Sequence, residues 1–357
     1  MQQHRFPAGL VVLTIALLLG ACAGPKEETK SAPAAPAAAT ASPSPVIPET
    51  KIVRKDPRFD KLVPADAKVE LLAQGHIWTE GPVWNRRENH LLFSDIPNNS
   101  IFKWEEGKGE SLFLKPAGYS GQEPFTGKEP GTNGLTFDAQ GRLVACAHGD
   151  RRVVRIEGTN KTTLADRFEG KRFNSPNDLA FKSNGDLYFT DPPYGLPKNM
   201  DDPGRELDFC GVYRLAKDGK LTLLTREITR PNGIALSPDE KKLYVACSDP
   251  DKAIWMAYDL KPDGTLGAGK VFFDATPWVK EKRPGLPDGL KVDQAGNLFA
   301  TGPGGVHVFA PDGTLLGSFD TGVPTANVAF GNDGSTLYIT ANTALLRVKL
   351  TTKGTGF

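Results

Sequence analysis

The chain has 357 residues and carries 43 lysine and arginine side chains against 42 aspartate and glutamate side chains, so its net charge is close to zero. A neutral balance without any basic run gives no electrostatic support for nucleic-acid binding. The 29 prolines and 38 glycines, without long apolar stripes at helical spacing, favour a fold of short strands and turns.

The beginning of the sequence has the features of an export signal. Basic residues precede an apolar stretch at 10–21, which is too short to span a bilayer as a mature helix. The stretch leads into LGAC at 19–22, which resembles the lipobox of bacterial lipoproteins. We therefore expect residues 1–21 to be a lipoprotein-type signal peptide and Cys22 to be lipidated. The alternative is an ordinary secretory signal, and both interpretations predict export, the first as a membrane-anchored lipoprotein on the periplasmic face.

A low-complexity segment separates this signal from the rest of the chain. Residues 22–55 are rich in Ala, Pro, Ser and Thr and show no apolar period, so they are predicted to be a flexible tether. Residues 56–357 are long enough for one large core. The cysteines of this part have scattered spacings without C-x-x-C, which favours free buried thiols over a zinc site or a disulfide framework. A bridge between two of them stays open; they are Cys146, Cys210 and Cys247.

A degenerate repeat runs through residues 56–357. Each copy has a polar start, an apolar strand, a turn with Gly, Asp or Asn, and further strands, as in EGPVWNRRENHLLFSD at 80–95. Six units of this kind predict an all-β, six-bladed propeller, because a β-sandwich would not repeat one strand–turn–strand pattern six times. The copies are spaced 38 to 56 residues apart and begin at Glu80, Asn133, Asn177, Asn232, Asp288 and Ala326.

The first residue of each copy is expected at the centre of the ring. The inner strand of every propeller blade lines the central channel, so the residue just before it points where the blades converge. Five of the six starts carry side-chain oxygens, and two of these are carboxylates. Asn-Gly and Asp-Gly pairs also form turns, but the hairpin turns of these blades lie elsewhere. Converging oxygens without a basic partner predict a central divalent cation, Ca²⁺ first, with Mg²⁺, Mn²⁺ or Zn²⁺ as alternatives.

Several motifs carry a family resemblance. The segments EGPVW from 80, SPNDLAF from 175, RPNGIALSPDEKKLYV from 230 and LPDGLKVDQAGNLFATGPGGVHVF from 286 are similar to the gluconolactonase / senescence marker protein (regucalcin) / luciferin-regenerating enzyme family. The resemblance covers about residues 65–350. It implies a six-bladed propeller that holds one divalent cation, commonly calcium, at the mouth of the channel, and it implies lactone hydrolysis.

The same resemblance implies roles for individual residues. Asn133 matches an element that contacts substrate or supports the ligands, and Asn177 can contact substrate as well as the metal. Ser175 stands where the family has an arginine, which puts sugar-acid contacts through that arginine in doubt. The metal ligands that the resemblance implies are Glu80, Asn177, Asn232 and Asp288.

The predicted chemistry needs a carboxylate beside the cation. Asp288 is the predicted catalytic group, either as the base that activates water or as the nucleophile. His148 and Asp191 follow or end the second strands of the second and third blades, and both are predicted substrate contacts, with a structural role equally open for His148. The long segments 115–131 and 192–211 are predicted to form the rim.

The sequence therefore predicts a calcium-dependent lactonase that opens a gluconolactone-like sugar lactone. We expect a monomer that meets the membrane only through its N-terminal lipid and binds no nucleic acid. No G-x-S-x-G motif offers a serine nucleophile. Two alternatives stay open: phosphotriester hydrolysis at the same metal, and a non-catalytic calcium-bearing propeller that serves as a binding module.

Overall fold

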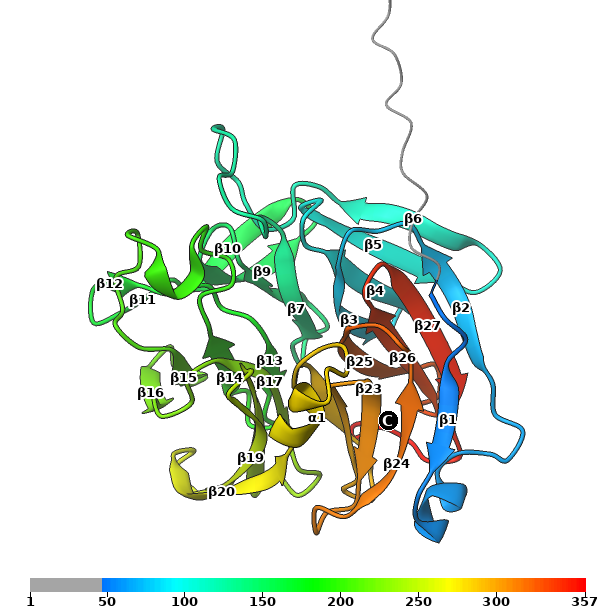
Figure 1. Ribbon diagram of the computed structural model, residues 1–357. Coiled ribbons are helices and arrows are strands. Elements are labelled where there is room, and N and C mark those ends of the chain that lie inside the picture. Colours follow the sequence, from blue (N-terminus) through cyan, green and yellow to red (C-terminus); the bar gives the residue numbers. More distant parts are fainter. Residues whose placement is uncertain (1–46) are drawn as a thin grey trace, which may run out of the picture. The chain divides into compact units, whose positions relative to one another are not determined.

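The computed structural model describes residues 47–357, which all belong to one compact unit. The predicted signal peptide, Cys22 and most of the predicted tether lie outside these residues. Six antiparallel sheets of four or five strands follow one another around a ring (Figure 1). The prediction of an all-β, six-bladed propeller is confirmed. Within residues 47–357, no helix combines the length and the apolar character needed to cross a membrane.

Each of the first four blades is built from four strands that follow one another in the sequence. Blade 1 contains β3 (Thr79–Asn85), β4 (His90–Asp95), β5 (Ser100–Glu105) and β6 (Gly109–Leu114). Blade 2 contains β7 (Thr132–Phe137), β8 (Leu143–Ala147), β9 (Arg152–Glu157) and β10 (Asn160–Ala165). Blade 3 contains β13 (Leu179–Phe181), β14 (Leu187–Asp191), β15 (Gly211–Leu215) and β16 (Leu221–Thr225). Blade 4 contains β17 (Pro231–Leu236), β18 (Lys242–Asp249), β19 (Lys252–Leu260) and β20 (Leu266–Asp274).

The remaining elements complete the ring and its connections. Blade 5 contains β21 (Leu290–Val292), β22 (Leu298–Gly302), β23 (Gly305–Phe309) and β24 (Leu315–Asp320). Blade 6 contains β25 (Thr325–Gly331), β26 (Thr336–Ala341) and β27 (Ala344–Lys349). The connections include a small hairpin, β11 (Arg167–Phe168) with β12 (Lys171–Arg172), the short helix α1 (Thr276–Lys280), and the 3-10 turns η1 (Pro57–Lys61) and η2 (Asn199–Asp201).

The N-terminal strands of the described chain complete the last two blades. Strand β2 (Val69–Gln74) pairs with β27 and supplies the fourth strand of blade 6. Strand β1 (Lys51–Arg54) pairs with β24 as a fifth strand of blade 5. The predicted tether boundary at residue 55 is therefore wrong, because the open edge of β24 offers backbone hydrogen bonds to residues 51–54. Phe59, which follows in η1, is fully buried against blade 5 and anchors this strand.

The core of the propeller consists of six apolar clusters, one between each pair of neighbouring blades. Alternate residues of a strand pack against opposite neighbours: Val144 of β8 faces blade 3, whereas Ala145 faces blade 1. Because both faces of each blade are covered, its middle strands are continuous apolar runs. The three cysteines of the described part are buried free thiols, as the sequence favoured.

His76 follows β2, the outer strand of blade 6, and its imidazole contacts two carboxylates of blade 1. Its Nδ1 lies 3.2 Å from Asp95 Oδ2 and its Nε2 lies 2.8 Å from Glu110 Oε2. Burial of the ring disfavours its charged form, but the hydrogen bonds with both carboxylates outweigh the burial and raise the pKa of His76 to about 9. The protonated imidazole therefore links blade 1 to blade 6, because His76 directly continues from β2.

The raised pKa of His76 predicts that the free energy of unfolding depends on pH. The folded-state pKa of His76 lies above its ordinary value of 6.5, so its contribution is complete below pH 6.5 and disappears as the pH rises through about 9. We expect His76→Gln to lower the free energy of unfolding at pH 6 and to change it little at pH 10. Urea unfolding of both proteins across this range measures the difference. A difference that stayed constant with pH would contradict the assignment.

Candidate active site

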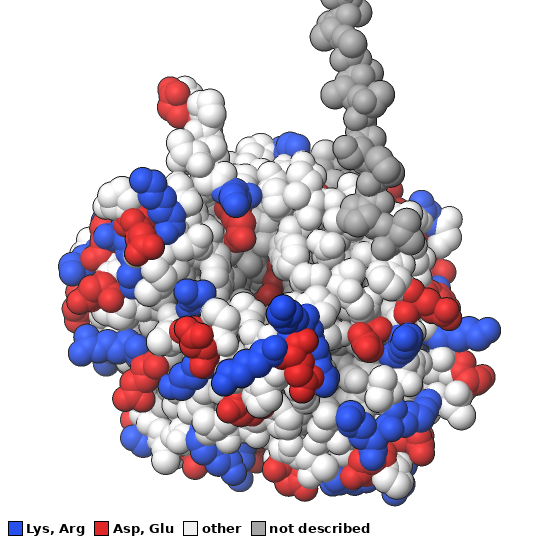
Figure 2. Space-filling model, viewed as in Figure 1, with Lys and Arg blue, Asp and Glu red and all other residues white. Residues whose placement is uncertain are grey.

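Five of the six predicted ring residues line one cavity of about 240 Å³ at the end of the central channel. The sixth position differs, because Ala326 does not line this cavity and its neighbour Thr325 does. Figure 2 shows one end of the ring, hollowed at its centre and surrounded by interspersed charges of both signs. The five residues are Glu80 in β3, Asn133 in β7, Asn177 before β13, Asn232 in β17 and Asp288 before β21.

Glycines next to the ring residues let the inner strands approach one another. A Cβ on Gly233 would lie 2.2 Å from the backbone oxygen of Asp288, and a Cβ on Gly134 would lie 2.7 Å from the backbone oxygen of Asn177. Neither glycine has a positive φ, so the Asn-Gly pairs at these positions are not turns. Glycine is needed here because the neighbouring backbone occupies the space of a side chain. The glycines that follow ring residues are Gly81, Gly134, Gly233 and Gly289.

Hydroxyl groups from the second strand of a blade also position the inner strand of the next blade. Each donates a hydrogen bond to a backbone oxygen at or beside a ring position. The position of one blade thus helps to fix the inner strand of the next. These contacts were not predicted from the sequence, although each hydroxyl belongs to the second-to-last residue of its strand. The pairs are Ser94 to Asn133 (2.9 Å), Thr190 to Asn232 (2.7 Å), Ser248 to Pro287 (2.6 Å) and Thr301 to Ala326 (2.8 Å).

The side-chain oxygens of this ring lack partners. The Oδ1 atoms of Asn133, Asn177, Asn232 and Asp288 are buried and accept no hydrogen bond from the described residues. Glu80 differs, since its Oε2 accepts from the Gly81 N–H at 2.6 Å and from Asn327 Nδ2 at 3.1 Å. A buried oxygen without a partner costs about 1–3 kcal/mol. Several such oxygens around one cavity fit a hard cation.

The two carboxylates of the ring resist ionisation in each other's presence. Burial raises the pKa of Glu80 to about 8; the Gly81 hydrogen bond opposes this shift and the charge of Asp178 adds to it. Burial also raises the pKa of Asp288 well above its ordinary value, with the charges of Glu80, Asp178 and Glu129 adding to the effect. A positive ion would reverse both shifts.

The donor set of the cavity is made of carboxylates and amides. Within residues 47–357, no group of three or more His, Cys, Asp or Glu side chains is arranged to hold a metal ion. The ring instead combines two carboxylates with three amide oxygens, a set that lacks nitrogen and sulfur ligands. Oxygen ligands of this kind suit Ca²⁺ and Mg²⁺ better than Zn²⁺.

The two segments predicted to form the rim both reach the cavity. Glu129 from 115–131 and Tyr194 from 192–211 are lining residues. His148 is fully buried and does not line the cavity, but its Nδ1 lies 3.0 Å from Glu129 Oε2. His148 is therefore placed to hold Glu129 toward the cavity. The sequence did not single out Glu129, because a residue in a loop has no register in the repeat.

Asp191 lies behind the site and not along the cavity, where a substrate contact was predicted. It is fully buried, and its carboxylate accepts the backbone N–H groups of Asn174 (2.9 Å) and Ser175 (2.8 Å). Burial raises the pKa of Asp191 to about 7, and these two hydrogen bonds oppose the shift. Its carboxylate holds the turn that presents Asn177 to the channel.

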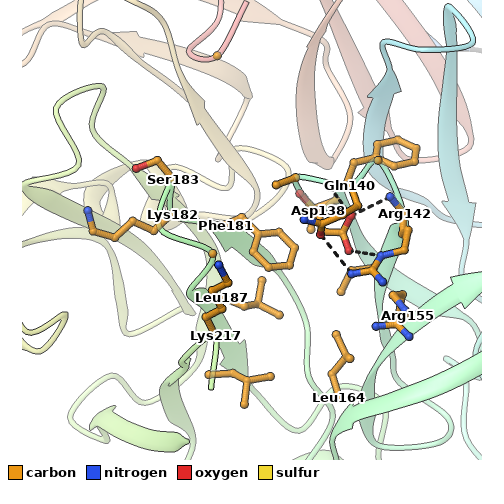
Figure 3. A pocket seen from close by; sticks show the side chains of 18 of the residues that line it. Asp138, Gln140, Arg142, Arg155, Leu164, Phe181, Lys182, Ser183, Leu187 and Lys217 are labelled. Atoms are coloured by element: carbon orange, nitrogen blue, oxygen red, sulfur yellow. Dashed lines mark hydrogen bonds and ion pairs between the residues drawn. The ribbon is translucent and has the colours of Figure 1, made fainter. Parts of the chain in front are cut away.

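A second cavity, of about 1180 Å³, lies at the opposite ends of the inner strands, among the hairpin turns (Figure 3). All of its acidic side chains are paired with basic ones: Asp138 with Arg142 at 2.7 Å, and Glu240 with Lys182 at 2.8 Å. Within the described chain, none of the buried oxygens without a partner lines this cavity. It is therefore not the candidate active site.

Comparison with known proteins agrees with this architecture. A family profile described as "SMP-30/Gluconolactonase/LRE-like region" matches residues 78–343. A gluconolactonase of Zymomonas mobilis is 42% identical over 319 residues, which cover 85% of this chain and 87% of that protein. A solved gluconolactonase of Xanthomonas campestris has a TM-score of 0.73 at 31% identity and covers 87% of this chain and 99% of its own. The calcium-binding regucalcin of Agrobacterium tumefaciens, at 20% identity and a TM-score of 0.60, covers 80% of this chain and 94% of its own and shares the fold. The chain belongs to the SMP-30/gluconolactonase/LRE-like family.

Proposed function

We propose that this protein is a lactonase that opens a sugar lactone of gluconolactone size with the help of one divalent cation. Glu80, Asn177, Asn232 and Asp288 would hold the ion. Their all-oxygen donor set suits Ca²⁺, Mg²⁺ and Mn²⁺ better than Zn²⁺, and Ca²⁺ is the first choice among them. The observation that carries the proposal is the convergence of buried oxygens without partners on one cavity of about 240 Å³. The gluconolactonase relatives support the reaction type, and the calcium-binding regucalcin supports the choice of ion.

When bound, a hard dication polarises a lactone carbonyl and stabilises the negative charge that develops on its oxygen. The carboxylate of Asp288 lines the cavity and would accept the proton of the attacking water, or attack the carbonyl carbon itself. In both routes the bond between the carbonyl carbon and the ring oxygen breaks. In the first, the ring oxygen takes up the proton that Asp288 accepted from water. In the second, the ring oxygen takes a proton from water, and a further water hydrolyses the acyl bond to Asp288 and frees its carboxylate. Glu80 is fixed by Gly81 and Asn327 and would act as a ligand only.

The remaining lining residues fit a polyhydroxylated ring. Trp78 offers an aromatic face, while Glu129, Tyr194 and Arg230 offer polar groups for hydroxyls. The guanidinium of Arg230 lines the cavity and is placed to meet a ligand there.

We also propose that the enzyme works outside the cytoplasm as a monomer, anchored to the membrane by a lipid on Cys22. This part of the proposal rests on the LGAC sequence and the apolar stretch before it. Its active domain would then meet lactones in the periplasm, and no other part of the chain would need to touch the membrane.

Removal of divalent cations tests the proposed function. We expect dialysis against EDTA to lower the hydrolysis of glucono-1,5-lactone by about 10²-fold, since a metal contributes several kcal/mol to the transition state. Added Ca²⁺ should restore the rate. Acid release followed in a pH-stat, with the uncatalysed rate subtracted, gives the measurement. Full activity in protein shown to be free of metal would contradict the proposal, and cation binding without hydrolysis of any lactone in a panel would favour a binding module.

A further inference from the structure

Three polar side chains lie next to the ring residues without lining the cavity. Asp178 follows Asn177 on blade 3, Lys291 lies in β21 of blade 5, and Asn327 lies in β25 of blade 6. Asp178 and Asn327 are each 2% exposed, whereas the Lys291 side chain is 30% exposed. Neither Asp178 nor Lys291 lines the cavity proposed for the substrate, so the hydrolysis assigned above does not use them.

These side chains form a continuous chain of polar contacts that ends on a proposed ligand. Asn327 donates from Nδ2 to Glu80 Oε2 at 3.1 Å, and its Oδ1 lies 3.4 Å from Lys291 Nζ. The same Nζ lies 3.9 Å from Asp178 Oδ2. Nζ also donates to the Leu290 backbone oxygen at 3.0 Å. Lys291 is thus connected to Glu80 through one amide and forms a long ion pair with Asp178.

The repeat makes room for this group by placing glycine in the adjacent blades. A Cβ on Gly289 would lie 1.9 Å from Asn327 Cγ, and a Cβ on Gly134 would lie 2.8 Å from Asp178 Oδ1. The residue after the ring position is glycine in four blades, and it is Asp178 or Asn327 in the other two. These two departures from the repeat therefore fill space that the glycines of neighbouring blades leave free.

The charges of the ring and of the side chains behind it add up to the charge of a divalent ion of opposite sign, and the two other charged residues that line the cavity, Glu129 and Arg230, cancel each other. The carboxylates of Glu80, Asp178 and Asp288 carry three negative charges when ionised, and Lys291 carries one positive charge. Among the described residues, Lys291 is paired with Asp178, while neither Glu80 nor Asp288 has an ion-pair partner. The net charge of the group is two negative units, which one dication neutralises and one trivalent ion would exceed.

We propose that Lys291, held by Asp178 and Asn327, is the built-in counter-charge of the cation site. It reduces repulsion among the carboxylates before the ion binds, and it lowers the attraction of the site for ions of higher charge. The inference rests on the cation site of the proposed function, but it concerns ion selectivity and metal-free stability and not the steps of hydrolysis. Electrostatics between fixed charges in a buried channel is strong enough for such selection.

Two charge-removing variants should have opposite effects. Lys291→Met keeps the aliphatic stem and removes the positive charge, so we expect the Kd for Ca²⁺ to fall about tenfold and the Kd for La³⁺ to fall further. Asp178→Asn should raise the Kd for Ca²⁺ by about the same factor. In EDTA, the melting temperature should fall for Lys291→Met, because the carboxylates lose their counter-charge. Calorimetric titration and thermal unfolding give these values.

Two further variants separate charge from packing. Lys291→Arg keeps the charge and should bind Ca²⁺ as the wild type does. Lys220→Met removes an exposed lysine in the turn between β15 and β16 and should change neither Kd nor melting temperature. Unchanged Kd values in both Lys291→Met and Asp178→Asn, or changes in the same direction, would overturn the inference while leaving the cation site in place. A wild-type protein that binds no divalent ion would overturn the proposed cation site and this inference with it.

Discussion

Asp288→Asn is expected to lower lactone turnover by about 10³-fold at saturating Ca²⁺, the range that loss of a general base produces. Asparagine keeps an oxygen that can face the ion but accepts no proton from water and cannot attack a carbonyl. The initial rate of acid release, measured at several Ca²⁺ concentrations, separates this loss from weaker ion binding. Hydrolysis by Asp288→Asn at the wild-type rate would remove Asp288 from the mechanism.

The same substitution should not harm the fold. Burial and the charges of Glu80, Asp178 and Glu129 all disfavour the ionised form of Asp288, and its Oδ1 has no hydrogen-bond partner among the described residues. Removing this charge relieves repulsion, so we expect the metal-free variant to melt at the same temperature as the wild type or higher. A gain in stability with a loss of turnover is the pattern of a group retained for function.

Asp293→Asn is the matched control, because this buried aspartate lies at the other end of the same inner strand, β21. Its Oδ2 accepts hydrogen bonds from Asn297 Nδ2 and Thr352 Oγ1, each at 2.8 Å, and an amide nitrogen in this place could accept neither. We expect the control to lose stability and keep its turnover number. Opposite responses of two aspartates in one blade would show that the loss of turnover comes from the cavity and not from damage to blade 5.

The repeat allowed the centre of the molecule to be predicted from the sequence. Equivalent positions of the blades occupy equivalent places around the axis. Once the six copies of the repeat are aligned, the alignment therefore places the inner strand of every blade. Glu80 and Asp288 are more than 200 residues apart in the sequence and line the same cavity for this reason. The alignment gave a ring residue with a side-chain oxygen in every blade except blade 6, where Ala326 takes the ring position and the polar Asn327 lies one residue further along.

Contacts that do not repeat could not be predicted in this way. The pairing of β2 with β27 depends on where the two ends of the ring meet, and no local pattern near residue 69 records it. Asp191 was misplaced for a related reason. Successive side chains of a strand point to opposite faces, so Thr190 reaches the next blade while Asp191 turns back toward Asn174. The sequence shows a polar residue at a strand end but not which face it occupies.

Glycine in the Asn-Gly and Asp-Gly pairs has a different role from the one its usual turn preference suggests. In blade 4 it permits close contact between two inner strands, since a Cβ on Gly233 would lie 2.2 Å from the Asp288 backbone oxygen and 2.7 Å from Gly289 Cα. The three nearest atoms all belong to the backbone of residues 288 and 289, so no flexible side chain could move aside. An added methyl group must therefore separate blade 4 from blade 5 at the site.

Gly233→Ala is therefore expected to lower the free energy of unfolding by about 3 kcal/mol, the upper part of the range for overpacking. The displacement of Asp288 should also lower turnover by about 10²-fold, as a shift of about 1 Å at a reacting group does. Urea unfolding and initial rates measure the two effects.

The control for this variant is Gly267→Ala, in β20 of the same blade, where a new Cβ would lie 3.3 Å from the Asp259 backbone oxygen. We expect the control to stay within about 0.5 kcal/mol of the wild type and to keep full activity. Alanine tolerated equally at both positions would mean that the inner strands can move apart without loss. A loss confined to Gly233→Ala would instead show that close contact between blades 4 and 5 fixes the position of Asp288, and that stability and catalysis depend on the same contact.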